Sequence, residues 1–174
     1  GKSKHYKFDE KIVLMQLKYV LNIHPNYEFN IFNSRRTPQS LNIQIENELK
    51  NFTNARFINI HHPNDLSFNA SLCESSLKFV TPDSANLVFE SLSTHGKTYL
   101  IQIESPNYRR WFGSKKIRST MNNLVMSKQV GVVSMLAKKN KLKISKIENP
   151  HPGIQPLAEV EKISFAIQKY LRGQ

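Results

Sequence analysis

Several features that mark large classes of proteins are missing from this sequence. It contains a single cysteine, Cys73, so no disulfide can form within the chain, and we expect a reducing, intracellular compartment. No run of about 18 apolar residues occurs, which excludes an α-helical membrane span. Glycine is scarce, and the stretch STHGKTY at 93–99 lacks the spacing of a phosphate-binding loop.

Residues that commonly carry catalytic or metal chemistry do not fall into a recognisable pattern. His61 and His62 are adjacent, so on a strand their side chains would point to opposite faces. Cys73, His95 and His151 lack the spacing of zinc ligands. We therefore expect a protein that is not an enzyme and that holds no metal and no cofactor. A nuclease or other nucleic-acid enzyme with an unrecognised site is the less favoured alternative.

Acidic residues are absent from one long segment, residues 105–146, which carries 11 Lys and Arg. The rest of the chain holds the other 14 cations against 13 acids, so nearly all of the net charge of +12 lies in this basic segment. Solvated protein surfaces normally mix charges of both signs. Clustering of this kind favours a polyanionic partner.

The cations of the basic segment surround the only tryptophan of the chain. Arginine side chains can fork onto phosphate oxygens, and exposed aromatic rings can stack on unpaired bases. The predicted nucleic-acid-binding residues are Arg109, Arg110, Trp111, Phe112, Lys115, Lys116, Arg118, Lys128, Lys138, Lys139, Lys141 and Lys143. We expect a non-catalytic protein that binds nucleic acid, RNA in preference to DNA. Such a protein would be a ribonucleoprotein or ribosome-associated component, with other proteins of that particle as partners.

Other interpretations of the same residues stay open. Residues 119–147 could form a helix-turn-helix-like segment with its turn near Gly131, followed by a wing, and so read duplex DNA. An anionic membrane surface would also attract the basic segment. Trp111 and Phe112 could simply be core residues.

The spacing of apolar residues predicts alternating helices and strands. Periods of three to four residues predict helices at 8–22, 37–52, 82–92, 119–138 and 157–173, with Asp9 and Thr37 as capping residues and the fourth segment as one helix or two meeting near Gly131. Alternation predicts strands at 27–32, 56–60, 77–80, 98–103 and 141–147, the last an edge strand guarded by lysines.

This order of elements favours an α/β or α+β fold. We expect a single layered domain in which helices pack on a sheet of four to six strands. Residues 1–8 read as a flexible basic lead-in, and residues 9–174 as a single globular domain that contains the basic segment.

Overall fold

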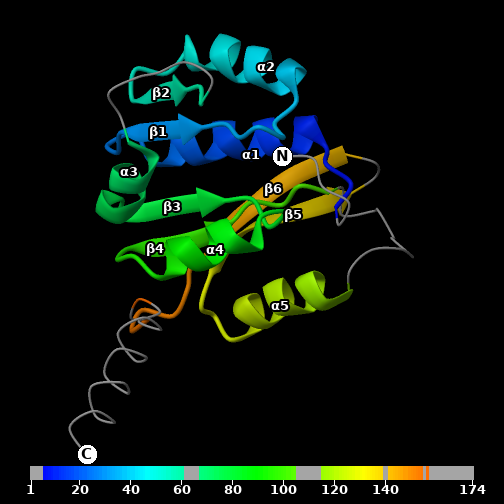
Figure 1. The fold of residues 1–174 in the computed structure, drawn as a ribbon. Coiled ribbons are helices and arrows are strands. Elements are labelled where there is room, and N and C mark those ends of the chain that lie inside the picture. Colours follow the sequence, from blue (N-terminus) through cyan, green and yellow to red (C-terminus); the bar gives the residue numbers. More distant parts are fainter. Residues whose placement is uncertain (1–5, 61–66, 105–114, 139–140, 155, 157–174) are drawn as a thin grey trace, which may run out of the picture.

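The protein has a mixed α/β fold, which confirms the expected fold class (Figure 1). The computed structural model describes residues 6–60, 67–104, 115–138, 141–154 and 156. The elements in this part of the chain are α1 (Glu10–Ile23), β1 (Phe29–Phe32), α2 (Gln39–Leu49), β2 (Ala55–Ile58), α3 (Phe68–Glu74), β3 (Leu77–Val80), α4 (Ala85–Leu92), β4 (Lys97–Leu100), α5 (Lys115–Met126), β5 (Gly131–Lys138) and β6 (Lys141–Glu148).

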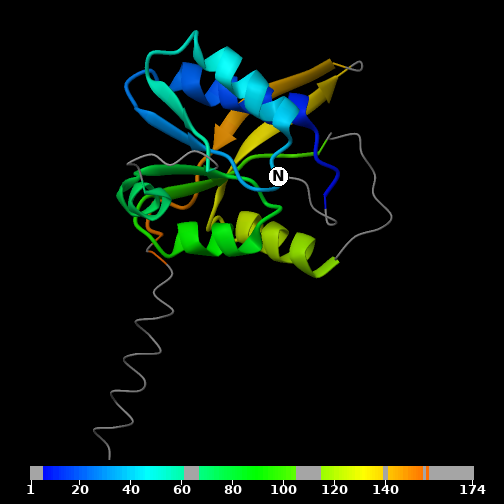
Figure 2. The same cartoon turned by 45° about the horizontal axis from the view of Figure 1, so that its top comes forward.

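The described strands form two sheets rather than one continuous sheet. β1 and β2 pair in parallel, and the second sheet has the order β3-β4-β5-β6. Its first three strands are parallel, and β6 returns antiparallel to β5 as an edge strand, which confirms the edge strand expected at 141–147. Figure 2 shows α1 and α2 on one side of the sheets and α4 and α5 on the other.

Each layer of helices covers its own apolar core. The core under α1 and α2 is formed by Val13, Leu21, Leu41, Ile45, Leu49 and Ile103. The core under α4 and α5 is formed by Val80, Val88, Leu92, Leu100, Met121, Leu124 and Val130. Burial of such aliphatic side chains is the main favourable term in folding, at about 1.5–3 kcal/mol each.

Of the two capping residues predicted from the sequence, one caps its helix and the other does not. Asp9 caps α1, because its carboxylate accepts hydrogen bonds from the backbone N–H groups of Lys11 and Ile12. The prediction that Thr37 caps α2 was wrong. The N-cap is Pro38, and the Thr37 hydroxyl accepts a hydrogen bond from the backbone N–H of Ser34 instead.

The helix expected over 119–138 was correct only up to its middle. Residues 131–138 form β5, which pairs with β4 and with β6, so the second helix of a helix-turn-helix is not there. Gly131 is needed at the start of β5 for a packing reason. A Cβ atom at this position would overlap the ring of Tyr99 and the carbonyl oxygen of Glu148.

One further difference concerns a single element, and two other expectations lie wholly or mostly outside the described residues. Helix α3, capped by Ser67, was not anticipated from its short polar sequence. The helix expected at 157–173 lies outside the described residues, as does most of the lead-in at 1–8.

A buried lysine closes the C-terminal end of α4. The Nζ atom of Lys78 donates hydrogen bonds to the carbonyl oxygens of Ser91 (2.6 Å), Thr94 (3.1 Å) and His95 (2.6 Å). A cation is favourable there, because the last carbonyls of a helix lack partners within the helix. Burial lowers the pKa of Lys78 to about 8.

A buried glutamine joins the two halves of the fold. The side chain of Gln16 on α1 is fully buried. Its Oε1 atom accepts a hydrogen bond from the backbone N–H of Gln102 (2.9 Å), and its Nε2 atom donates to the backbone carbonyl of Gln102. The side-chain amide therefore pairs with both the N–H and the carbonyl of Gln102, which lies just past β4. In a sheet, the backbone of a neighbouring strand would make these two hydrogen bonds.

We expect Gln16→Leu to lower the free energy of unfolding by about 2 kcal/mol or more, because it leaves the backbone N–H and carbonyl of the partly buried Gln102 without these partners. Urea unfolding followed by circular dichroism measures the change. Lys11→Leu is the control, since it places leucine at an exposed position of the same helix. Equal stability of the two variants would contradict the role assigned to Gln16.

Candidate functional site

Polar residues gather where the parallel strands end. β1, β3 and β4 run in the same direction (Figure 1), so the residues that follow them meet at one edge of the molecule. We call this region the carboxyl edge and define it as residues 33–38, 81–84, 101–104 and 115–118. In open α/β sheets, ligands bind outside the carboxyl ends of the strands. The carboxyl edge is therefore the candidate site.

An ion pair joins the segments that follow β1 and β3. The Nη2 atom of Arg36 lies 3.3 Å from Oδ2 of Asp83. The Asp83 side chain is 2% exposed, whereas that of Arg36 is about half exposed at 49%. A buried carboxylate needs such a partner, because an unpaired charge is costly to desolvate. The pair fixes the two sheets relative to each other at the carboxyl edge.

A second charged cluster lies where the basic segment begins and where α5 starts. The Nη2 atom of Arg118 donates to both carboxylate oxygens of Glu104, each at 2.7 Å. The same guanidinium lies 4.7 Å from the ring centroid of Tyr6. Burial raises the pKa of the Tyr6 hydroxyl more than the nearby Arg118 lowers it. Arg118 is thus committed to contacts within the protein.

Hydrogen bonds also order the segment that follows β1. The Asn33 side chain donates to Oδ1 of Asn59 (2.9 Å) and accepts from the backbone N–H of Ile60 (2.8 Å). Ser34 and Thr37 close a turn, and Arg35 between them is exposed. Arg35 therefore places a positive charge at the carboxyl edge.

The structure places many of the predicted binding residues on one side of the molecule. Lys115, Lys116 and Arg118 lie in the first turn of α5, at the carboxyl edge. Lys138 ends β5 and Lys141 begins β6, so both lie on the same side as the carboxyl ends of β3 and β4 (Figure 1).

The remaining predicted residues differ in position. Lys143 is exposed on β6. Lys128 follows the far end of α5, where its carbonyl oxygen accepts a hydrogen bond from the backbone N–H of His151. The part of the chain that the structure describes does not include Arg109, Arg110, Trp111, Phe112 and Lys139.

Sequence reasoning missed Arg35, Arg36, Asp83 and Glu104. All four are charged residues that come within four positions after an apolar strand pattern. Parallel strands would have brought them to one edge, but the direction of the strands was not evident before the structure.

The described residues contain neither a metal-binding group nor a membrane-spanning helix. No group of three or more His, Cys, Asp or Glu side chains is close enough there to hold a metal ion. None of the helices in these ranges has the length and apolar content to cross a membrane.

The fold and the site define a class: an α/β protein with helices on both faces of mostly parallel sheets and with charged residues where the strands end. Comparison with known families then identifies the chain. It belongs to the family described as Mitochondrial fission ELM1, which it matches over residues 1–171. No curated protein and no solved structure matches it.

We expect Glu104→Gln to lower the free energy of unfolding by about 1.5–3 kcal/mol, because it removes the charge partner of a half-buried guanidinium. Urea unfolding measures the loss. Lys146→Met is the matched control, since the Lys146–Glu148 pair is exposed and its N–O distance is 3.7 Å. Exposed pairs contribute little, so the control should change stability by no more than about 1 kcal/mol. A loss in the control as large as in Glu104→Gln would refute this assignment.

Proposed function

We propose that this chain is a non-catalytic nucleic-acid-binding protein that holds single-stranded RNA at its carboxyl edge. The observation that carries the proposal is the charge of the basic segment, 11 cations and no acid over residues 105–146. Two described residues near the start of this segment support the location. Glu104, which precedes it, and Lys115 on α5 both lie at the carboxyl edge.

The chemistry follows from counterion release. Each phosphate that a lysine or arginine neutralises frees a condensed counterion, so affinity falls steeply as salt rises. Lys116 and Arg35 are exposed cations at the carboxyl edge, whereas Arg118 is paired with Glu104. The binding role thus rests on these exposed cations together with the residues of the basic segment.

Single-stranded RNA is preferred to duplex DNA as the ligand. Reading a duplex with a helix-turn-helix needs a second helix at 131–138, where the chain forms β5. Unpaired bases need only phosphate contacts and flat rings, and Trp111 and Phe112 are proposed to supply the rings.

Charge reversal at the two ends of α5 tests the proposal. Lys116→Glu and Lys128→Glu change the charge equally at two exposed positions, but only the first lies at the carboxyl edge. We expect Lys116→Glu to weaken binding of a fluorescent oligo-uridine by about tenfold and to reduce the salt dependence. Lys128 is among the binding residues predicted from the sequence, but it lies past the other end of α5. Lys128→Glu should therefore leave the affinity within about threefold of the original value.

Fluorescence anisotropy at two salt concentrations gives both quantities, and thermal unfolding checks that each variant is folded. Equal effects of the two variants would place the RNA elsewhere. Duplex DNA and phosphatidylserine vesicles are tested in parallel. Tighter binding of either one would replace single-stranded RNA as the proposed ligand.

The family match favours a second candidate, a part in mitochondrial fission. We expect a fluorescent fusion of the chain, expressed in cultured eukaryotic cells, to lie on mitochondria and to shorten them. Light microscopy of mitochondrial length measures the effect. The fluorescent protein without the chain is the control, and it should leave mitochondrial length unchanged. Equal lengths with and without the intact chain would contradict this role.

A further inference from the structure

The chain leaves β1 and β3 in opposite directions. From β1 it passes through α2 to β2, on one side of β1, whereas from β3 it passes through α4 to β4, on the other side of β3. Figure 2 shows α2 and α4 on opposite faces of the sheets. In doubly wound α/β folds, such a change of direction opens a crevice outside the carboxyl ends of the two strands, and ligands bind there.

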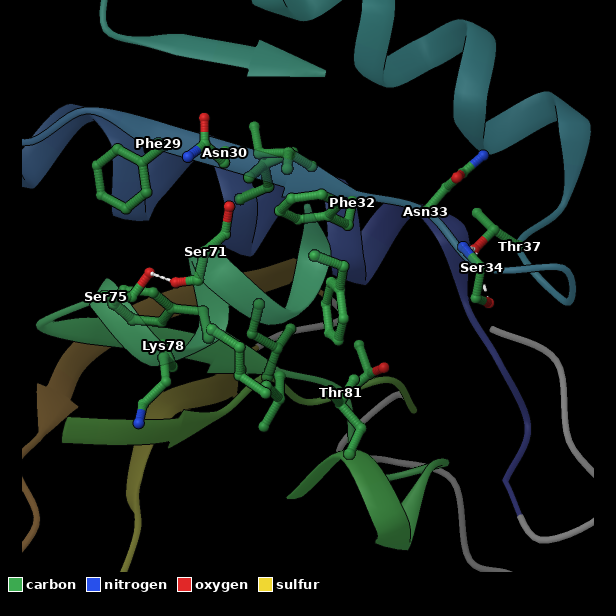
Figure 3. A pocket seen from close by; sticks show the side chains of 18 of the residues that line it. Phe29, Asn30, Phe32, Asn33, Ser34, Thr37, Ser71, Ser75, Lys78 and Thr81 are labelled. Carbon is green, nitrogen blue, oxygen red and sulfur yellow. Dashed lines mark hydrogen bonds between the residues drawn. The ribbon is translucent and has the colours of Figure 1, made fainter. Parts of the chain in front are cut away.

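A cavity between β1 and β3 reaches the residues that follow these two strands. Its volume is about 910 Å³. We call its carboxyl end the crevice and define it by the lining residues Phe32, Ser34, Arg35, Thr37, Phe68, Thr81 and Ser84. In Figure 3, the labelled side chains of Phe32, Ser34 and Thr81 lie around this end of the cavity. Several of these residues belong to the carboxyl edge, so the crevice opens within the proposed RNA-binding region.

The charged groups that line the cavity differ between its two ends. Glu28 precedes β1, Glu74 precedes β3, and Glu90 lies near the C-terminal end of α4, so these acids lie toward the amino ends of the strands. In the crevice, Arg35 is accompanied by neutral side chains that carry hydroxyl groups or aromatic rings. This end of the cavity therefore suits a phosphate next to a neutral planar group.

Two aromatic rings stand at the crevice. Phe32 ends β1 and Phe68 begins α3, and their ring centroids lie 5.1 Å apart with an angle of 86° between the ring planes. The Phe68 side chain is large and apolar, yet the residue is 36% exposed. An exposed ring of this kind offers a flat face on which an unpaired base can stack.

The backbone places an acceptor and a donor beside these rings. The N–H of Asn33 bonds to the carbonyl of Ile58 on the β2 side, and the carbonyl of Val80 accepts from Ile101 on the β4 side. Within one trans peptide unit, the C=O and the N–H point in opposite directions.

The carbonyl of Phe32 therefore points away from β2, and the N–H of Thr81 points away from β4. Both groups are directed into the space between β1 and β3. The edge of a nucleic-acid base carries donors and acceptors that such groups can bond.

Ser84 adds a hydroxyl group that its own helix does not use. Ser84 is the N-cap of α4, but its side chain makes no capping hydrogen bond. A serine in this position usually accepts a hydrogen bond from an N–H group in the first turn of the helix. The hydroxyl can therefore bond to a group in the crevice.

From this geometry we infer that the crevice holds one unpaired base of the RNA strand. The base stacks on Phe68, its edge faces the Phe32 carbonyl and the Thr81 N–H, and its phosphate lies beside Arg35. The inference rests on the proposed function, since the strand must first be held at the carboxyl edge. It adds a contact with a base to the contacts with phosphates, and base contacts are the ones that give sequence specificity.

A matched pair of variants tests this base site. Phe68→Leu removes the flat ring at the crevice and keeps an apolar side chain. Phe89→Leu makes the same change on α4, at a residue that is 38% exposed and lies outside the lining of the cavity. The probes are a fluorescent oligo-uridine and a fluorescent abasic strand of the same length, which keeps the phosphates and lacks the bases. Fluorescence anisotropy gives both affinities, and thermal unfolding checks that each variant is folded.

We expect the original chain to bind oligo-uridine about tenfold more tightly than the abasic strand, because the abasic strand cannot stack. Phe68→Leu should weaken binding of oligo-uridine by about fivefold or more and leave the affinity for the abasic strand unchanged. Phe89→Leu should change neither affinity. An unchanged affinity of Phe68→Leu for oligo-uridine, or an equal loss for both strands, would overturn the inference.

Ser84→Ala is a second variant, which removes one hydroxyl group from the crevice. It should weaken binding of oligo-uridine by about threefold and leave the abasic strand unaffected. If Phe68→Leu fails to fold, Ser84→Ala decides the inference, and an unchanged affinity for oligo-uridine would overturn it.

The two strands also separate this inference from the proposed function. Equal affinity of the original chain for both strands would overturn the base site and leave phosphate binding at the carboxyl edge in place. If the original chain binds neither strand, the proposed function and the base site are both overturned.

Discussion

The arrangement of this molecule depends on the pairing of one buried side-chain amide with one backbone position. Gln16 gives Gln102 a donor and an acceptor in the place where a strand would otherwise stand. Because an unpaired buried peptide group is costly, the position of α1 over the second sheet is narrowly fixed. Asp9 reinforces it, since its backbone N–H bonds to the carbonyl of Ile103. The two sheets are thereby held together although no strand of the described residues joins them.

Two ion pairs hold the segments of the carboxyl edge together. Asp83 and Glu104 are the acids at the ends of β3 and β4, and each holds an arginine from a different part of the chain, Arg36 and Arg118. Their burial makes these pairs specific, because a carboxylate removed from water needs a close cation. The paired arginines are structural. Lys116 and Arg35 are exposed, which is why the binding role is proposed for them rather than for Arg118.

The carboxyl edge and the cavity between β1 and β3 are adjoining features of the same fold. Residues that follow these two strands, among them Arg35 and Thr81, line the cavity and also belong to the carboxyl edge. The Arg36–Asp83 pair joins the same two segments. Membership in the mitochondrial fission ELM1 family covers both features, since the match runs over residues 1–171.

The sequence by itself determined those elements whose signals are local. The Asp9 cap and the 3.6-residue period predicted α1, and the alternation of LKFV predicted β3 at its observed bounds. Residues 131–138 were misassigned because a run of Val, Met and Leu suits a buried strand as well as a helix. Only the tertiary structure decided that these residues pair with β4, that Arg118 meets Glu104, and that a cavity opens between β1 and β3. Each of these is a contact between distant parts of the chain, which no local pattern of residues encodes.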